Sequence, residues 1–138
     1  NMLSGGFMGG IFRSIGNARY SPQRSSTTLQ GYRGTRNPLM DFTDKNGNST
    51  LQRHLNDHGA LLGISDKQQY MNTARNFLDK PMTSTMQEFT SDMGWYFRYD
   101  TATNEFGIIN QFGGISTYFM PDEGINYWVT QILNYAPR

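Results

Sequence analysis

The chain lacks cysteine and long apolar runs, and each absence excludes a class of protein. Without cysteine there is no disulfide scaffold, no cysteine-ligated zinc site and no thiol nucleophile. No stretch approaches the ~18 consecutive apolar residues of a membrane span. Residues 2–6 lack the basic stretch and apolar core of a secretory signal, so none is expected there. Aromatic residues, in contrast, make up 14% of the 138 residues, which predicts a folded domain with a modest core.

The net charge of +1 is the sum of two unlike parts. Residues 1–48 carry six basic and two acidic residues, a net charge of +4, together with eight of the 15 glycines. Residues 49–138 carry six basic and nine acidic residues, a net charge of −3. The first part shows helical spacing of apolar residues only between residues 7 and 15. We therefore predict a basic arm or linker, rich in glycine and serine, over residues 1–48 and a folded domain over residues 49–138.

Two helices are predicted at the start of the folded part. Apolar residues at helical spacing follow residue 51, with Ser49 or Thr50 as the N-cap and Gly63 or Gly59 as the stop. A capping box at residues 65–68 opens a second helix, which must end before proline 81. The predicted buried face of this second helix comprises Tyr70, Ala74, Phe77 and Leu78.

From residue 94 onward the apolar residues alternate with polar ones, which is typical of strands. This spacing predicts a half-buried strand over residues 95–100, a return strand over 106–109 and a third strand over 115–119. Apolar residues then return to helical spacing over residues 125–133, which predicts a closing helix. Helices followed by a strand meander predict an α+β fold, with the helices on one face of a small antiparallel sheet.

The chain has only two histidines, His54 and His58, and their spacing places both on one helix face. A zinc-protease pattern needs a glutamate directly after the first histidine, and Leu55 stands there. No third ligand is evident, so neither a metal nor another cofactor is expected. His58, beside Gly59, is a candidate for proton transfer. The same position also suits a structural histidine that interacts with the last carbonyls of a helix.

The third predicted strand supplies a complementary set of side chains. Thr117 and Phe119 are expected to share a face with Ile115. A hydroxyl beside an aromatic ring can hold a phosphate and stack a base, and Arg98 on the neighbouring strand could add positive charge. Taken alone, these residues also fit an ordinary sheet surface of β-branched and aromatic side chains.

Three segments in this order resemble a known group of toxins. Residues 51–64, 98–109 and 113–119 resemble the colicin D-type ribonuclease domain and the C-terminal toxin domains of bacterial polymorphic toxins, including those of contact-dependent growth inhibition systems. The resemblance spans about residues 49–123. It implies the α+β fold shared by barnase-like, colicin and RelE-like ribonucleases. It also implies metal-independent cleavage of RNA, usually tRNA, inhibition by a cognate immunity protein, and secretion or surface delivery into the cytoplasm of a target bacterium.

The resemblance assigns roles to particular residues. His58 matches the catalytic histidine, while Thr117 and Phe119 fall where colicin D has a serine and a tryptophan. Three lysines of the colicin D site are replaced here, by Leu55, Asp57 and Met120. We expect that Arg53, Arg98 and the basic arm supply the missing positive charge. Asn110 and His54 are further candidates for the same pocket.

The expected reaction is transesterification, in which a 2′-hydroxyl attacks the adjacent phosphate. His58 would act as base or acid, and Thr117 and Arg98 would hold the phosphate. Two alternatives stay open: a non-catalytic protein-binding module, which the −3 charge of residues 49–138 favours, and a toxin of other nuclease chemistry. In the ribonuclease interpretation the partners are an RNA and an immunity protein, with the chain a monomer or one half of a heterodimer.

Overall fold

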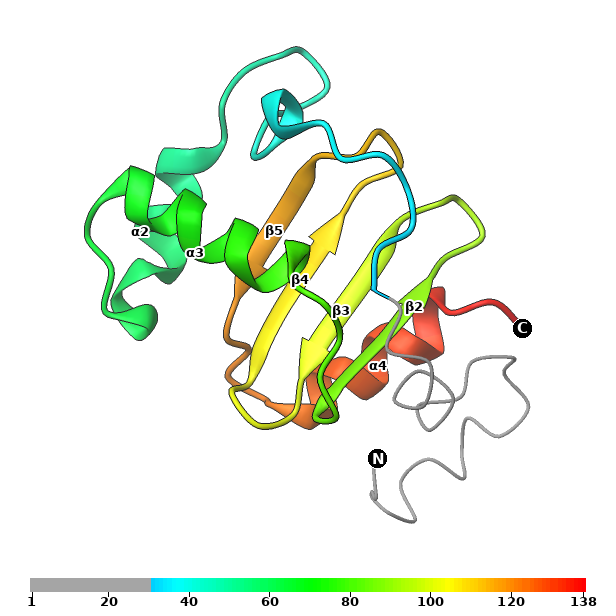
Figure 1. The fold of residues 1–138 in the computed structure, drawn as a ribbon. Coiled ribbons are helices and arrows are strands. Elements are labelled where there is room, and N and C mark those ends of the chain that lie inside the picture. Colours follow the sequence, from blue (N-terminus) through cyan, green and yellow to red (C-terminus); the bar gives the residue numbers. More distant parts are fainter. Residues whose placement is uncertain (1–30) are drawn as a thin grey trace.

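A computed structural model describes residues 31–138, and Figure 1 shows their arrangement. The predicted helical stretch between residues 7 and 15 lies outside these residues. The elements in chain order are η2 (Pro38–Met40), α2 (Leu51–Leu62), α3 (Lys67–Asp79), β2 (Met86–Thr90), β3 (Tyr96–Asp100), β4 (Glu105–Ile109), β5 (Ile115–Phe119) and α4 (Ile125–Tyr135). The four strands form one antiparallel meander in the order β2-β3-β4-β5. The predicted α+β class is therefore confirmed.

Helices α2 and α3 form for the local reasons that the sequence indicates. The Ser49 hydroxyl accepts the backbone N–H of Leu51 at 3.2 Å, and Gly63 ends α2 in the left-handed conformation with φ +70°. The predicted capping box of α3 is wrong by one residue, because Asp66 is the N-cap and accepts the N–H of Gln69 at 2.9 Å. The predicted buried face of α3 is confirmed in all four positions: Tyr70, Ala74, Phe77 and Leu78.

Helices cover both faces of the sheet. Helices α2 and α3 lie on one face and α4 lies on the other, as Figure 1 shows. All five residues of β3 are consequently buried, so the prediction of a half-buried strand with helices on one face only is wrong. Strand β2 was not predicted, because its polar residues interrupt the apolar alternation. We call the two sides the helix-pair face and the α4 face.

A bulge in β5 decides which face its side chains occupy. Ile108 pairs with Thr117, whereas Ile109 pairs with Ile115, so one extra residue of β5 lies between the two pairs. Ile115 is therefore buried in the core on the helix-pair face, whereas Phe119 and the partner of Thr117 pack on the α4 face. The prediction that Ile115 shares a face with Thr117 and Phe119 is wrong, although the latter two do share one.

The segment before α2 belongs to the folded body. The buried carboxylate of Asp41 accepts hydrogen bonds from Arg36 at 2.9 and 3.0 Å, from Arg75 at 2.8 Å and from the N–H of Ile115 at 2.7 Å. Phe42 is fully buried in the core of the helix-pair face. The sequence placed these positions in an arm that ends at residue 48, but the packing extends across that boundary. A single buried carboxylate that binds α3, β5 and its own segment accounts for this, and no periodicity in the sequence reveals it.

Candidate active site

The fold brings the candidate histidine of α2 against the last strand. The imidazole of His58 stacks on the ring of Phe119, with centroids 4.7 Å apart and planes 18° apart. Both residues are half-buried, at the place where α2 lies beside β5 (Figure 1). The histidine and the aromatic residue that were expected to share a site are therefore in direct contact.

The surroundings of His58 favour its neutral form. Burial lowers the pKa of His58 below its usual 6.5, and the positive charge of Arg53 lowers it further. The nearby carboxylates of Asp57 and Asp122 oppose this effect. Because the pKa lies below the ordinary value, the imidazole is largely neutral at pH 7 and can accept a proton.

The second histidine lies deeper than the first. His54 is buried, with its ring 5.0 Å from that of Phe42 and 5.9 Å from that of His58. Burial, followed by the charges of Arg53 and His58, lowers its pKa to about 4. Its Nδ1 atom is buried without a hydrogen-bond partner. His54 is therefore a neutral core residue next to His58, not a surface group that meets a substrate.

Thr117 lies on the α4 face, two residues before Phe119 and on the same side of the strand. It is half-buried and pairs with Ile108 of β4. A hydroxyl at this position is directed to the same side of the sheet as the ring on which His58 stacks. The structure thus brings His58 and Phe119 into contact, and Thr117 lies two residues before Phe119 on the same side of the strand.

Arg98 does not join this group. Its side chain is fully buried on the helix-pair face, opposite to Thr117, because β-strand side chains alternate between faces. The guanidinium donates to the Tyr96 hydroxyl at 3.0 Å and to the carbonyl oxygens of Phe77 at 2.7 Å and Lys80 at 2.8 Å. It satisfies backbone carbonyls at the end of α3. The assignment of Arg98 to phosphate binding is therefore corrected to a structural one.

The two other candidates have different positions. Asn110 is buried in the turn between β4 and β5, where its side-chain oxygen accepts the N–H groups of Phe112 at 2.9 Å and Gly114 at 3.2 Å. This stabilises the turn and leaves Asn110 outside the candidate site. Arg53 is exposed on α2, the helix that carries His58, and its charge acts on that histidine.

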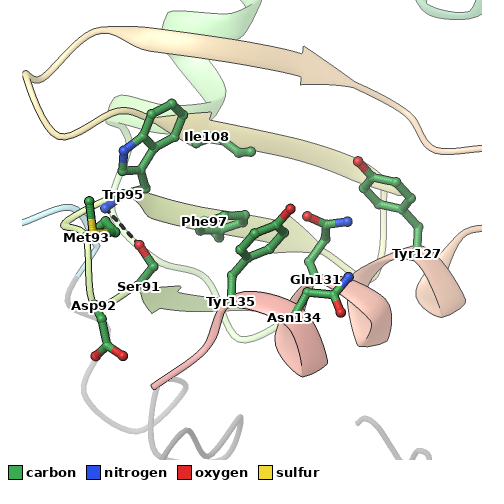
Figure 2. A pocket seen from close by; sticks show the side chains of 10 residues that line it. All are labelled: Ser91, Asp92, Met93, Trp95, Phe97, Ile108, Tyr127, Gln131, Asn134 and Tyr135. Atoms are coloured by element: carbon green, nitrogen blue, oxygen red, sulfur yellow. Dashed lines mark hydrogen bonds between the residues drawn. The ribbon is translucent and has the colours of Figure 1, made fainter. Parts of the chain in front are cut away.

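The α4 face also carries a groove that the sequence analysis missed. It has a volume of about 670 Å³ and lies between α4, the β2–β3 loop and strands β3 and β4 (Figure 2). Tyr127 lines it and contacts Phe119 edge-on, with ring centroids 5.4 Å apart. Tyr127 therefore lies between the groove and the His58–Phe119 pair. A signal existed in the sequence, since Tyr127, Gln131 and Tyr135 follow one another at intervals of four along α4.

Other classes of site find no support in the described part of the chain. Among residues 31–138, no group of three or more His, Cys, Asp or Glu side chains is placed to hold a metal ion. No helix within the same residues is long and apolar enough to cross a membrane. No protein-family model matches the chain, and no curated protein matches it. Function is therefore inferred from the side chains of the site and from the segment resemblance.

Proposed function

We propose that this chain is a toxin-type endoribonuclease that cleaves RNA, with tRNA as the expected substrate, by metal-independent acid–base chemistry. The observation that carries the proposal is the stack of a neutral, half-buried His58 on Phe119, with Thr117 on the same face of β5. A proton acceptor can start the cleavage of RNA, a hydroxyl can donate to the phosphate, and aromatic rings beside them can bind the bases of a single strand.

The reaction balances with these groups. The neutral imidazole of His58 takes the proton of a ribose 2′-hydroxyl as its oxygen bonds to the adjacent phosphorus. The bond from phosphorus to the 5′-oxygen then breaks, and that oxygen takes a proton from water. The hydroxide left behind takes the proton that His58 accepted, which returns His58 to its neutral form. The products are a 2′,3′-cyclic phosphate and a free 5′-hydroxyl end. Thr117 donates to a phosphate oxygen, and Arg53 adds positive charge where the phosphorane is most anionic.

We assign the fold to the barnase, colicin and RelE group, although the α+β class alone does not define that group. Two observations support the assignment: paired helices precede the antiparallel sheet, and His58 of the first helix contacts Phe119 of the last strand. The same proposal includes delivery into a target bacterium and neutralisation by an immunity protein. The buried position of Arg98 leaves fewer cations in the site than we expected from the sequence.

Cleavage of total tRNA in the presence of EDTA tests the proposal. His58→Ala should lower the rate by about 10²–10⁴-fold, the usual contribution of a general base. Thr117→Val keeps the shape of the side chain and should lower the rate to a smaller extent. The wild-type rate should rise with pH through an apparent pKa below 6.5. Mapping of fragment ends should find 2′,3′-cyclic phosphates. Full activity of His58→Ala, or loss of wild-type activity in EDTA, contradicts the proposal.

The second candidate is a protein-binding module on the same fold. The −3 charge of residues 49–138 and the burial of Arg98 favour it, because both weaken attraction to a polyanion. Even if only a few cations contact the RNA, its affinity should fall as the salt concentration rises. Binding of a protein partner that is insensitive to salt, without RNA cleavage, would support this second function. Toxicity on expression in bacteria, relieved by a co-expressed immunity protein, would support the first.

A further inference from the structure

We infer that the groove on the α4 face binds an unpaired nucleobase of the RNA, next to the phosphate that is cleaved at His58. This inference rests on the proposed ribonuclease function and adds a substrate subsite to it. Figure 2 shows the groove with Trp95 and Met93 at one end and Tyr127 at the other. Its volume of about 670 Å³ lies within the ordinary range for small-ligand sites.

Aromatic rings form much of the lining. Tyr135 stacks on Phe97, with ring centroids 5.5 Å apart and planes 21° apart, and it remains 52% exposed. Trp95 is half-buried, and its indole N–H donates to Gln111 at 3.3 Å. Exposed or half-exposed rings on a rigid sheet are the surfaces on which proteins stack single-stranded bases.

The polar groups of the groove suit a base better than a phosphate. Gln131 and Asn134 lie on the side of α4 that lines the groove, and each carboxamide can both donate and accept a hydrogen bond. That combination matches the edge of a nucleobase. None of the described residues that line the groove is a lysine or an arginine, and Asp92 is among them. An uncharged ring is therefore a better occupant than an anion.

The position of the groove connects it with the proposed reaction. One wall residue, Ile108, pairs with Thr117. At the other end, two ring contacts lead from the groove to the histidine: Tyr127 to Phe119 at 5.4 Å and Phe119 to His58 at 4.7 Å. A strand whose phosphate lies between His58 and Thr117 can place the base of a neighbouring nucleotide in the groove. The base preference of cleavage would then be determined by Gln131 and Asn134.

Tryptophan fluorescence can report occupancy of the groove directly. The chain has two tryptophans, and Trp128 is fully buried with its indole N–H bonded to Gln87 at 2.7 Å. Trp95 is therefore the residue that a stacked base should quench. The titration uses the full chain with His58→Ala, so that RNA is bound without being cleaved. The probes are a mixed-sequence single-stranded RNA oligonucleotide and an abasic strand of equal length.

The RNA should quench the emission saturably, the abasic strand should do so much less, and Trp95→Phe should abolish the response. In the His58→Ala background, Tyr135→Ala should raise the Kd of the RNA about tenfold, because stacking on one ring contributes about that much. In the same background, Asn134→Ala should also raise the Kd of the RNA. As a single substitution in the active enzyme, it should alter the base preference at one side of the cut. The matched control is Asn76→Ala, which replaces an exposed asparagine of α3 on the helix-pair face. It should change neither the Kd of the RNA nor the base preference.

The outcomes separate the two proposals. Wild-type cleavage without any RNA effect on Trp95, or an unchanged Kd in Tyr135→Ala, overturns the subsite and leaves the ribonuclease. Equal quenching by the abasic strand also overturns the subsite. Quenching by RNA that depends on Trp95 and Tyr135, without cleavage by the wild type, supports a nucleobase site and contradicts only the ribonuclease. A response to a protein partner and to no RNA makes the groove a protein-binding surface and overturns the inference.

Discussion

The two faces of the sheet are packed in opposite ways. On the helix-pair face, α3 approaches β4 so closely that a Cβ atom on Gly107 would lie 2.8 Å from the Leu78 side chain. On the α4 face, large rings separate the helix from the strands, with Trp128 6.2 Å from Phe106 between centroids. The close contact brings α3 directly onto β4, whereas the bulky rings leave room for a groove beside α4. A glycine on one side and aromatic residues on the other thus determine how closely a helix approaches each face of the sheet.

Polar residues follow the same division. The helix-pair face buries Arg98, which donates to the Tyr96 hydroxyl at 3.0 Å, and Tyr96 in turn donates to the half-buried Glu88 at 2.5 Å. The α4 face also buries Gln87, which accepts the Trp128 indole N–H at 2.7 Å, but Gln131 and Asn134 line its groove, where they can reach a ligand. Buried polar groups with fixed partners specify the fold, whereas polar groups beside an open aromatic surface are free to recognise a ligand.

The largest expected effect of removing a charged side chain is at Arg98. Arg98→Leu should lower the free energy of unfolding by about 3 kcal/mol or more, because the carbonyls of Phe77 and Lys80 and the Tyr96 hydroxyl lose a charged donor inside the protein. Urea unfolding followed by circular dichroism measures the change. The control is Arg53→Leu, an exposed arginine that should change stability by less than about 0.5 kcal/mol but weaken RNA binding. If Arg98→Leu were as stable as wild type, the buried hydrogen bonds of Arg98 would not hold the end of α3 to the sheet as described.

A second prediction concerns the pH dependence of the helix-pair face. His54 has a pKa of about 4 in the folded state against 6.5 ordinarily, so between these values the unfolded chain binds the additional proton. Stability should therefore be complete above pH 6.5 and decrease as the pH falls toward 4, by at most about 1.4 kcal/mol per pH unit from this residue.

Replacement of that histidine isolates its contribution. His54→Leu should lose this part of the pH dependence, and relative to wild type it should become more stable as the pH is lowered from 6.5 to 5. Gln52→Leu, at an exposed position of the same helix, should keep the wild-type dependence. Urea titrations at each pH measure both. Parallel stability curves for wild type and His54→Leu would show that the burial of His54 has no such consequence.

The elements of the fold were largely predictable, because they depend on neighbouring residues. The buried face of α3, from Tyr70 to Leu78, follows from spacing alone. The burial of Arg98 was not predictable in this way, since its partners lie on α3 and in the following loop. The bulge in β5 reverses the expected position of Ile115 and has no marker in the sequence, such as a glycine in the strand.

The site was predictable only in part. The contact between His58 and Phe119 joins two distant segments, and only the resemblance of those segments suggested it. Residues of the groove come from three places in the chain, among them Trp95 and Tyr127, and none of these places indicates a pocket by itself. Local patterns predict helices and strands, whereas a groove depends on how far a helix is held from the sheet.

The smallest expected effect is at Tyr135, and it compares the two faces directly, because the same change from tyrosine to alanine can be made on α4 and on α3. Tyr135→Ala on α4 removes a ring that is 52% exposed and stacked on Phe97, and it should cost about 1 kcal/mol or less. Tyr70→Ala on α3 removes a fully buried ring whose hydroxyl donates to the carbonyl of Tyr118, and it should cost about 3–5 kcal/mol. Both changes are measured by urea unfolding. Equal costs would mean that Tyr135 is part of the core and that the α4 face is as closed as the other. A small cost at Tyr135 together with a weaker affinity for RNA would mean that the ring is retained for recognition, because packing alone would not require it there.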